Sequence, residues 1–268
     1  MMRKRQFYQR WKRRFRAGLA DSETLLVRCL EAGDADTVHE LRVTLRRTRL
    51  LSLVGTPVLG KPSAMLFRQW ALKVAAALSQ LRDCDVTLEW LRAHFPALER
   101  LHAVQVHRTG LWRRARRKLL PLARLPWKQV RRWESTSAKT RKLRRKFLKE
   151  SARIQERLSH EAARFEDLDS AALHEFRRTL RRLRYLRELD LSRREQRCDQ
   201  ILKRLVSFQE ALGEMQNCLV VRTFFASEAG FRWRHKVVRS AELQERQWLR
   251  RAEGHLTEFL RKRAPVRR

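Results

Sequence analysis

Glycine and proline are scarce in this sequence, which contains eight glycines and six prolines among 268 residues. Because both residue types interrupt or end regular elements, their scarcity predicts long elements joined by few connections. Long apolar runs are absent as well, and none approaches the roughly 18 uninterrupted residues of a membrane-spanning helix. The basic N-terminus, MMRKRQFYQRWKRRFRAG, lacks the apolar run of a signal peptide. We therefore expect a soluble protein of the cytoplasm.

Cysteine is also sparse. Cys29, Cys84, Cys198 and Cys218 form no CxxC pair and show no zinc-like spacing with histidine. We expect them to be reduced thiols in the core, as is usual in a cytosolic protein. The sequence also lacks a glycine-rich phosphate loop, a paired-carboxylate motif and a Ser/His/Asp set. These absences predict a protein that is not an enzyme and that has neither a metal site nor a cofactor.

Positive charge is what the sequence has in excess. It contains 63 lysine and arginine residues against 29 acidic residues, a formal net charge of +34. Self-repulsion on this scale disfavours a compact fold, so we expect a polyanion or an anionic surface as the partner. Arginine outnumbers lysine, and its planar guanidinium holds two phosphate oxygens where an ammonium acts as a point charge. The composition therefore favours a partner rich in phosphate.

The remaining composition predicts an all-α protein. Leucine, alanine, arginine, glutamate and lysine are frequent and all favour helices, while 43% of the residues are apolar, enough for a packed core. No segment shows the alternation expected of strands. Each half is predicted to form a bundle of about four helices. The predicted helices are 20–32, 36–54, 63–80, 84–94 and 97–119, then 138–165, then 171–191, 194–213, 217–229 and 231–263.

Two short blocks occur twice, in the same order and at nearly the same spacing. HELRVTLRRTR begins at His39 and HEFRRTLRRLR begins at His174, while LSQLRDCDV at 78–86 is matched by LGEMQNCLV at 212–220. Such self-similarity indicates an internal duplication. The predicted organisation is a basic arm at 1–18, a first repeat at about 19–120, a basic linker or helix at about 121–168, and a second repeat at about 169–263.

The first of these blocks places a histidine at the head of a row of arginines. On a helix that advances about 100° per residue, Arg42, Arg46 and Arg49 lie beside His39, and Arg47 lies on the other flank. Neighbouring like charges destabilise a helix by about 0.2–0.5 kcal/mol per pair, so a row repeated twice suggests an anionic ligand. A merely solvated basic surface is the alternative. The candidate binding residues are His39, Arg42, Arg46, Arg47 and Arg49, and in the second copy His174, Arg177, Arg178, Arg181, Arg182 and Arg184.

His39 has two interpretations, as a hydrogen-bond donor to phosphate or as a residue that packs between helices. Neighbouring cations lower the pKa of a histidine, so the ring would be neutral without ligand and protonated beside an anion. The segment from Thr37 to Glu40 predicts a capping box at the start of the histidine helix.

The second block has a structural and a metal-binding interpretation. Asp83 and Asn217 lie where one predicted helix gives way to the next, and both residue types are favoured N-caps. Gly213 fits the end of the preceding helix, and Asp83 would in addition orient an arginine. The alternative makes Asp83 and Asp85 metal ligands, which the second copy does not support because it has Asn217 and Leu219 there.

The paired and duplicated blocks resemble those of the CHAD family, the conserved histidine α-helical domain. The resemblance covers almost the whole chain beyond the basic arm, with departures at Ser79, where a glycine is expected, and at Gln216 and Asn217. It implies two four-helix bundles related by a pseudo-twofold axis, with basic side chains from both halves lining a central cleft that binds inorganic polyphosphate. It further implies a stand-alone form of the domain, associated with polyphosphate granules.

Nucleic acid is the alternative partner, because a charge of +34 and eight tryptophans would serve it as well. Trp70, Trp90 and Trp248, however, have apolar neighbours at core spacing and are predicted to pack inside. No recognised nucleic-acid-binding motif is present. A third role, compatible with the first, is the coating of anionic granules or membranes through Arg3–Arg16 and residues 111–146.

Overall fold

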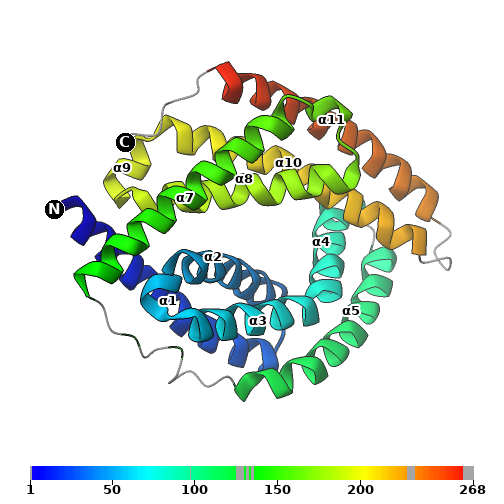
Figure 1. Ribbon diagram of the computed structural model, residues 1–268. Coiled ribbons are helices and arrows are strands. Elements are labelled where there is room, and N and C mark those ends of the chain that lie inside the picture. The colour runs from blue at the N-terminus through cyan, green and yellow to red at the C-terminus, as the bar shows by residue number, and fades with distance from the viewer. Residues whose placement is uncertain are drawn as a thin grey trace. The chain divides into compact units, whose positions relative to one another are not determined.

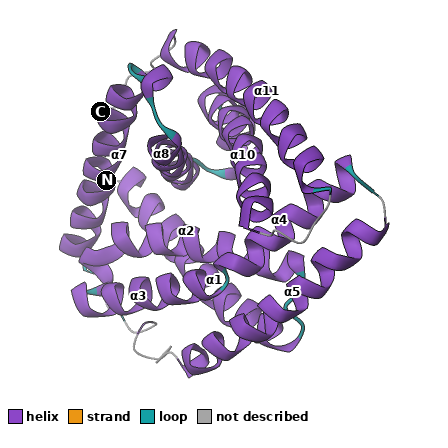
Figure 2. Cartoon of the chain, turned by 90° about the vertical axis from the view of Figure 1, so that its right-hand side faces the viewer, coloured by secondary structure: helices purple, strands orange, loops and turns teal. Residues whose placement is uncertain are grey.

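The computed structural model describes residues 2–96, 98–124, 130, 133, 136–227 and 233–261. Within these residues the regular structure is helical throughout and contains no strand (Figure 2), which confirms the predicted all-α class. The chain divides into two compact units, Met1–Lys149 and Glu150–Arg268. The division falls inside the segment predicted as a basic linker or helix.

The first unit is built around contacts between successive helices. Helix α1 packs on α2, α2 packs on α3, and α4 packs on α5 (Figure 1). A 3-10 helix, η1, follows α5, and the Trp70 indole donates a hydrogen bond to the carbonyl of Leu122 within it. The elements are α1 (Met2–Glu31), α2 (Ala35–Leu59), α3 (Lys61–Ala77), α4 (Ser79–His94), α5 (Leu98–Leu119), η1 (Leu120–Arg124) and the first half of α7 (Ser137–Ala162).

The residues predicted as a basic arm form the first half of α1. Phe7, Trp11 and Phe15 recur every fourth residue and are almost completely buried, because residues at this spacing share one helix face. Trp11 stacks on Phe15 with 5.5 Å between ring centroids, and its indole donates to the carbonyl of Leu51 in α2 at 2.9 Å. Burial of such side chains stabilises a fold by about 1.5–3 kcal/mol each. The N-terminus is therefore part of the core of the first unit.

Helix α2, which carries the first row of arginines, begins earlier and ends later than predicted. Its N-cap is Asp34, whose carboxylate accepts from the amide of Thr37 at 2.8 Å, so the predicted capping box at Thr37 is wrong. The helix continues through Pro57, which has no amide to donate to the carbonyl of Leu53. The hydroxyl of Thr56 donates to that carbonyl instead, at 2.8 Å. The helix ends at Gly60, whose φ of 81° suits glycine.

The second unit contains the other histidine helix, α8, packed on α10, which in turn packs along α11. Its core includes a triad of Phe165, Phe176 and Phe208, whose ring centroids are 5.3–6.2 Å apart. Asp169 caps α8 by accepting from the amide of Ala172 at 2.7 Å. The elements are the second half of α7, η2 (Phe165–Asp167), α8 (Ser170–Asp190), α9 (Arg193–Cys198), α10 (Gln200–Ser227) and α11 (Arg234–Arg261).

The second sequence block marks a helix start in the first unit only, and not at the predicted residue. Helix α10 runs without interruption through Gly213 and Asn217. In the first unit α3 and α4 are separated only at Leu78, and the amide of Arg82 still donates to the carbonyl of Leu78 at 3.0 Å. Asp83 therefore lies inside a helix where the backbone amides already have partners. The predicted N-caps at Asp83 and Asn217, and the predicted helix end at Gly213, are wrong.

Three other groups of predictions are confirmed, two of them only in part. In α7 the predicted apolar face of Leu143, Phe147, Ile154 and Leu158 is buried. The four cysteines are free thiols, but only three are buried, and Cys198 is exposed at the end of α9. Trp70 and Trp90 are buried as expected, whereas Trp248 is partly exposed, with the guanidinium of Arg251 above its ring at 4.4 Å. Among the described helices, none combines the length and apolar character needed to span a bilayer.

Candidate anion-binding site

The first row of arginines lies on one face of α2, as predicted. Leu41 and Leu45 are fully buried on the core side of this helix. His39 and Arg47 are exposed, while the three arginines of the predicted arc are half-buried at the edge of the core. This helix therefore presents a histidine and a row of cations beside its buried stripe.

Arg42 is anchored to the neighbouring helix. Its Nη1 donates a hydrogen bond to the carbonyl of Ala75 in α3 at 2.7 Å. Burial and the charge of Arg46 lower the pKa of Arg42, while the charge of Asp83 acts in the opposite direction. The charge of Asp83, inside α4, thus acts on an arginine of the row, and the orienting role expected for Asp83 stays a prediction.

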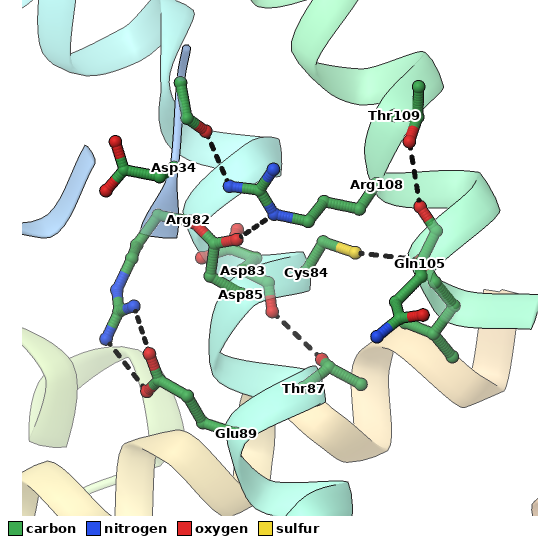
Figure 3. Close-up of polar contacts among 12 residues, drawn as sticks. Asp34, Arg82, Asp83, Cys84, Asp85, Thr87, Glu89, Gln105, Arg108 and Thr109 are labelled. Atoms are coloured by element: carbon green, nitrogen blue, oxygen red, sulfur yellow. Dashed lines mark hydrogen bonds and ion pairs between the residues drawn. The ribbon is translucent and has the colours of Figure 1, made fainter. Parts of the chain in front are cut away.

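Arg82 of α4 adds a cation to the same site, although it is not among the residues that the sequence predicts to bind. Its guanidinium makes two hydrogen bonds to the carboxylate of Glu89, further along α4, at 2.9 and 3.3 Å (Figure 3). Partial burial, followed by the charges of Arg82 and Arg46, lowers the pKa of His39, against the charge of Glu89. The sequence feature that could have identified Arg82 is its position in the second repeated block, beside Asp83. Helices α2 and α4 therefore both bring positive charge near His39, and Glu89 offsets part of it.

In the second unit the histidine of α8 has a neutral partner. His174 is exposed on α8, and its Nδ1 lies 2.9 Å from Oε1 of Gln216 in α10. With the amide oxygen as acceptor, Nδ1 carries the ring proton. Gln216 occupies the position in its block that Arg82 occupies in the first. Arg177 also faces α10, because its Nη2 lies 3.5 Å from the position that a Cβ on Gly213 would take.

The other predicted residues of α8 are distributed over two flanks. Arg184 pairs with Glu188 at 3.3 Å and lies over the ring of Tyr185, and Arg181 is buried, with 8% of its surface exposed. Arg178 and Arg182 instead turn towards Glu175, at 2.9 and 3.9 Å. The structure therefore groups His174 with Arg177 on the side of α10 and separates them from Arg178 and Arg182.

Asp85, the second candidate metal ligand, has a structural role. Its side chain is completely buried and accepts from Nε of Arg108 in α5, whose Nη2 donates to the carbonyl of Gly33 at 2.7 Å (Figure 3). Burial raises the pKa of Asp85, although the hydrogen bond and charge of Arg108 oppose the shift. Within the part of the chain that the structure describes, no group of three or more His, Cys, Asp or Glu side chains could hold a metal ion.

Comparison with known proteins identifies the relatives of this fold. The family model of the CHAD domain matches residues 11–226, whereas no curated protein matches the sequence. Similar solved structures include the CHAD domain from the plant Ricinus communis (TM-score 0.64, 20% identity, 93% of this chain and 91% of that chain). Another is PptA from Streptomyces chartreusis (TM-score 0.59, 15% identity, 94% and 97%). The match to the family model extends over most of the chain, which therefore belongs to the CHAD family.

Proposed function

We propose that the protein binds inorganic polyphosphate through the histidine and arginine faces of α2 and α8, without chemical turnover. The observation that carries this proposal is the gathering of His39, Arg42, Arg46 and Arg82, whose charges act on one another across two helices. Like charges at this separation repel, so an anion that neutralises them stabilises the arrangement. The family to which the chain belongs is linked to polyphosphate, which supports the same ligand.

The chemistry of these faces favours a chain of phosphates over nucleic acid. Arginine holds phosphate oxygens in pairs, and a flexible polyanion gains affinity from many such contacts and from the release of its counterions. Recognition of single-stranded nucleic acid would also use aromatic rings on which bases stack. Trp70 and Trp90 are buried in the core of the first unit, the charge of Arg82 acts on His39, and the side chain of Gln216 contacts His174. We therefore propose a binding protein that gathers on polyphosphate granules in the cytoplasm.

A competition titration tests this proposal. Long-chain polyphosphate and duplex DNA of matched total charge are titrated against the protein at about 0.15 M salt, where unspecific charge contacts are screened. Polyphosphate is expected to bind more tightly and to keep its chain length during prolonged incubation. Equal or tighter binding of DNA would contradict the proposed ligand, and shortening of the polyphosphate would contradict binding without turnover.

Polyphosphate affinity is expected to fall as the pH rises from about 5 to about 8. The pKa of His39 in the free protein is lowered by partial burial and by Arg82, and a bound phosphate raises it again. Between the free and bound pKa values the complex takes up a proton, so affinity is highest below the free pKa and declines as the pH rises through this window. Calorimetry in buffers of different ionisation enthalpy measures the proton uptake.

The control for this pH dependence is a histidine outside the site. His39→Gln is expected to remove most of the proton uptake by the first unit, whereas His102→Gln, at an exposed position of α5, is expected to leave it unchanged. An unaltered pH profile in His39→Gln would show that this histidine packs beside the site and does not protonate on binding.

A further inference from the structure

A second cluster of cations lies on the flank of α8 that faces α7. Three arginines contact the carboxylate of Glu175 there. Arg178 lies 2.9 Å from Oε2, and Arg157 and Arg182 lie 3.5 and 3.9 Å from Oε1. Arg153, one turn before Arg157 on α7, is the fourth, and its charge acts on Arg182. These four residues, Arg153, Arg157, Arg178 and Arg182, are called the α7–α8 arginine cluster below.

The cluster is open to solvent. The exposed fractions of its side chains are 77% for Arg153, 44% for Arg157, 46% for Arg178 and 42% for Arg182, and 30% of Glu175 is exposed. A small anion therefore reaches the guanidinium groups without a rearrangement of the helices.

Glu175 makes only one close contact with these arginines. Charge-assisted hydrogen bonds are usually about 2.7–2.9 Å long, and only the contact from Arg178 falls in this range. Arg157 has a closer partner in Glu161 of its own helix, at 2.6 Å, while Arg153 reaches Glu150 only at 4.0 Å. Burial, together with the charges of Arg178, Arg157 and Arg153, lowers the pKa of Arg182 although Glu175 opposes the shift. Repulsion among the guanidinium groups thus remains.

A run of phosphate groups would fit the cluster better than the single carboxylate does. Each internal group of a polyphosphate chain carries two free oxygens and one negative charge, so adjacent groups can offer different oxygens to three guanidinium groups. Such a run brings several negative charges, whereas Glu175 supplies one carboxylate to three arginines.

We propose that the α7–α8 arginine cluster is a second phosphate-binding site, in which adjacent phosphate groups of a polyphosphate chain displace Glu175 as the counter-ion of Arg157, Arg178 and Arg182. This inference rests on the proposed function, since other groups of the same chain contact the face of His174 and Arg177. Glu175 then acts as a built-in competitor. A single phosphate displaces it poorly, whereas a long chain, held by neighbouring contacts, brings a high local concentration of phosphate to the cluster.

Removal of the charge of Glu175 tests the proposal, because a binding site and a structural salt-bridge network predict opposite results. Glu175→Gln keeps the size of the side chain and a hydrogen-bonding oxygen. It is expected to tighten binding of long-chain polyphosphate about three- to fivefold, the upper part of the scale of an exposed ion pair. Glu210→Gln, at an exposed position of α10, makes the same change in net charge and is expected to alter affinity less than about twofold.

Two further variants keep the test independent of folding. Arg153→Gln, on a largely exposed side chain, is expected to weaken binding while the melting temperature stays unchanged. In the double variant Glu175→Gln/Arg157→Gln the gain from Glu175→Gln is expected to disappear. If Glu175→Gln binds no more tightly than Glu210→Gln, the cluster is only a network that holds α7 to α8, and the inference is overturned. Absence of polyphosphate binding by the unaltered protein is a distinct result that overturns the proposed function itself.

Discussion

Replacement of Arg46 and Arg82 by glutamine is expected to weaken polyphosphate binding by about 100-fold. The two side chains come from different helices, α2 and α4, and both act on His39. A hydrogen bond to a charged group contributes about 1.5–3 kcal/mol, and each 1.4 kcal/mol corresponds to a tenfold change in affinity. The dependence of affinity on salt should also become shallower, by a little under one unit of slope for each phosphate group that the variant no longer neutralises. Titrations at several salt concentrations measure both effects.

The matched control removes the same charge from another part of the first unit. Arg113 and Arg117 are exposed on α5, and their joint replacement by glutamine is expected to weaken binding only a few-fold. Circular dichroism and thermal melting establish that both double variants are folded. Equal reductions of affinity in the two variants would mean that the protein attracts polyphosphate through its net charge, and that the face of α2 and α4 has no special role.

Replacement of Arg108 by methionine is expected to lower the free energy of unfolding by about 3–5 kcal/mol, the usual effect of removing one partner of a buried ion pair. The carboxylate of Asp85 is completely buried and has no ionic partner in this variant. The carbonyl of Gly33, in the turn that leads into α2, is deprived of a donor at the same time. Denaturant-induced unfolding measures the change in stability, and Arg92→Met, at an exposed position of α4, serves as the control.

The effect of Arg108→Met should shrink as the pH falls. Burial raises the pKa of Asp85 above its ordinary value in the folded protein, so the folded state binds this proton more tightly than the unfolded state does. Ionised Asp85 therefore destabilises the fold at neutral pH, and this destabilisation is relieved as the pH falls through the folded pKa. Without Arg108 the pKa rises further, and protonation rescues the variant at mildly acidic pH.

A double variant separates this explanation from a simple defect in packing. Asp85→Asn/Arg108→Met leaves no charge at either position, and it is expected to recover part of the stability and to lack the pH dependence. A double variant as unstable as Arg108→Met at every pH would show that the arginine stabilises the unit by packing and not by compensating Asp85.

The buried face of α2 could be predicted from the sequence, whereas the position of the break between α3 and α4 could not. The spacing of buried residues predicted the face of α2 correctly, since Leu41 and Leu45 lie on one side whatever the helix packs against. The break at Leu78 lies a few residues earlier than predicted, and its counterpart in the second unit does not exist. Helix propensity predicts the opposite, because glycine disfavours a helix more than serine does. The helix is nevertheless continuous at Gly213 and begins anew at the equivalent Ser79. Packing within each unit therefore overrides the local preference.

The candidate site shows the same division between local and tertiary information. The angular position of each arginine on α2 and α8 followed from the sequence, but the helix that each one faces did not. Arg82 joins the site only because α4 brings it near His39, whereas Arg182 turns towards Glu175 of its own helix, on the flank where Arg157 of α7 also contacts Glu175. The sequence did contain a feature that marks the starts of α2 and α8. Asp34 and Asp169 stand at equivalent distances before the two histidines, and each is the N-cap of its helix.

The exchange of Arg82 for Gln216 gives the two histidines different electrostatic surroundings. Partial burial lowers the pKa of His39, and the charges of Arg82 and Arg46 add to this effect. His174 instead has a neutral amide beside its Nδ1, at 2.9 Å. One exchange in the second block thus replaces a charged neighbour of the histidine by a neutral one, so the two faces differ in charge although the two histidines stand at equivalent places in the first block.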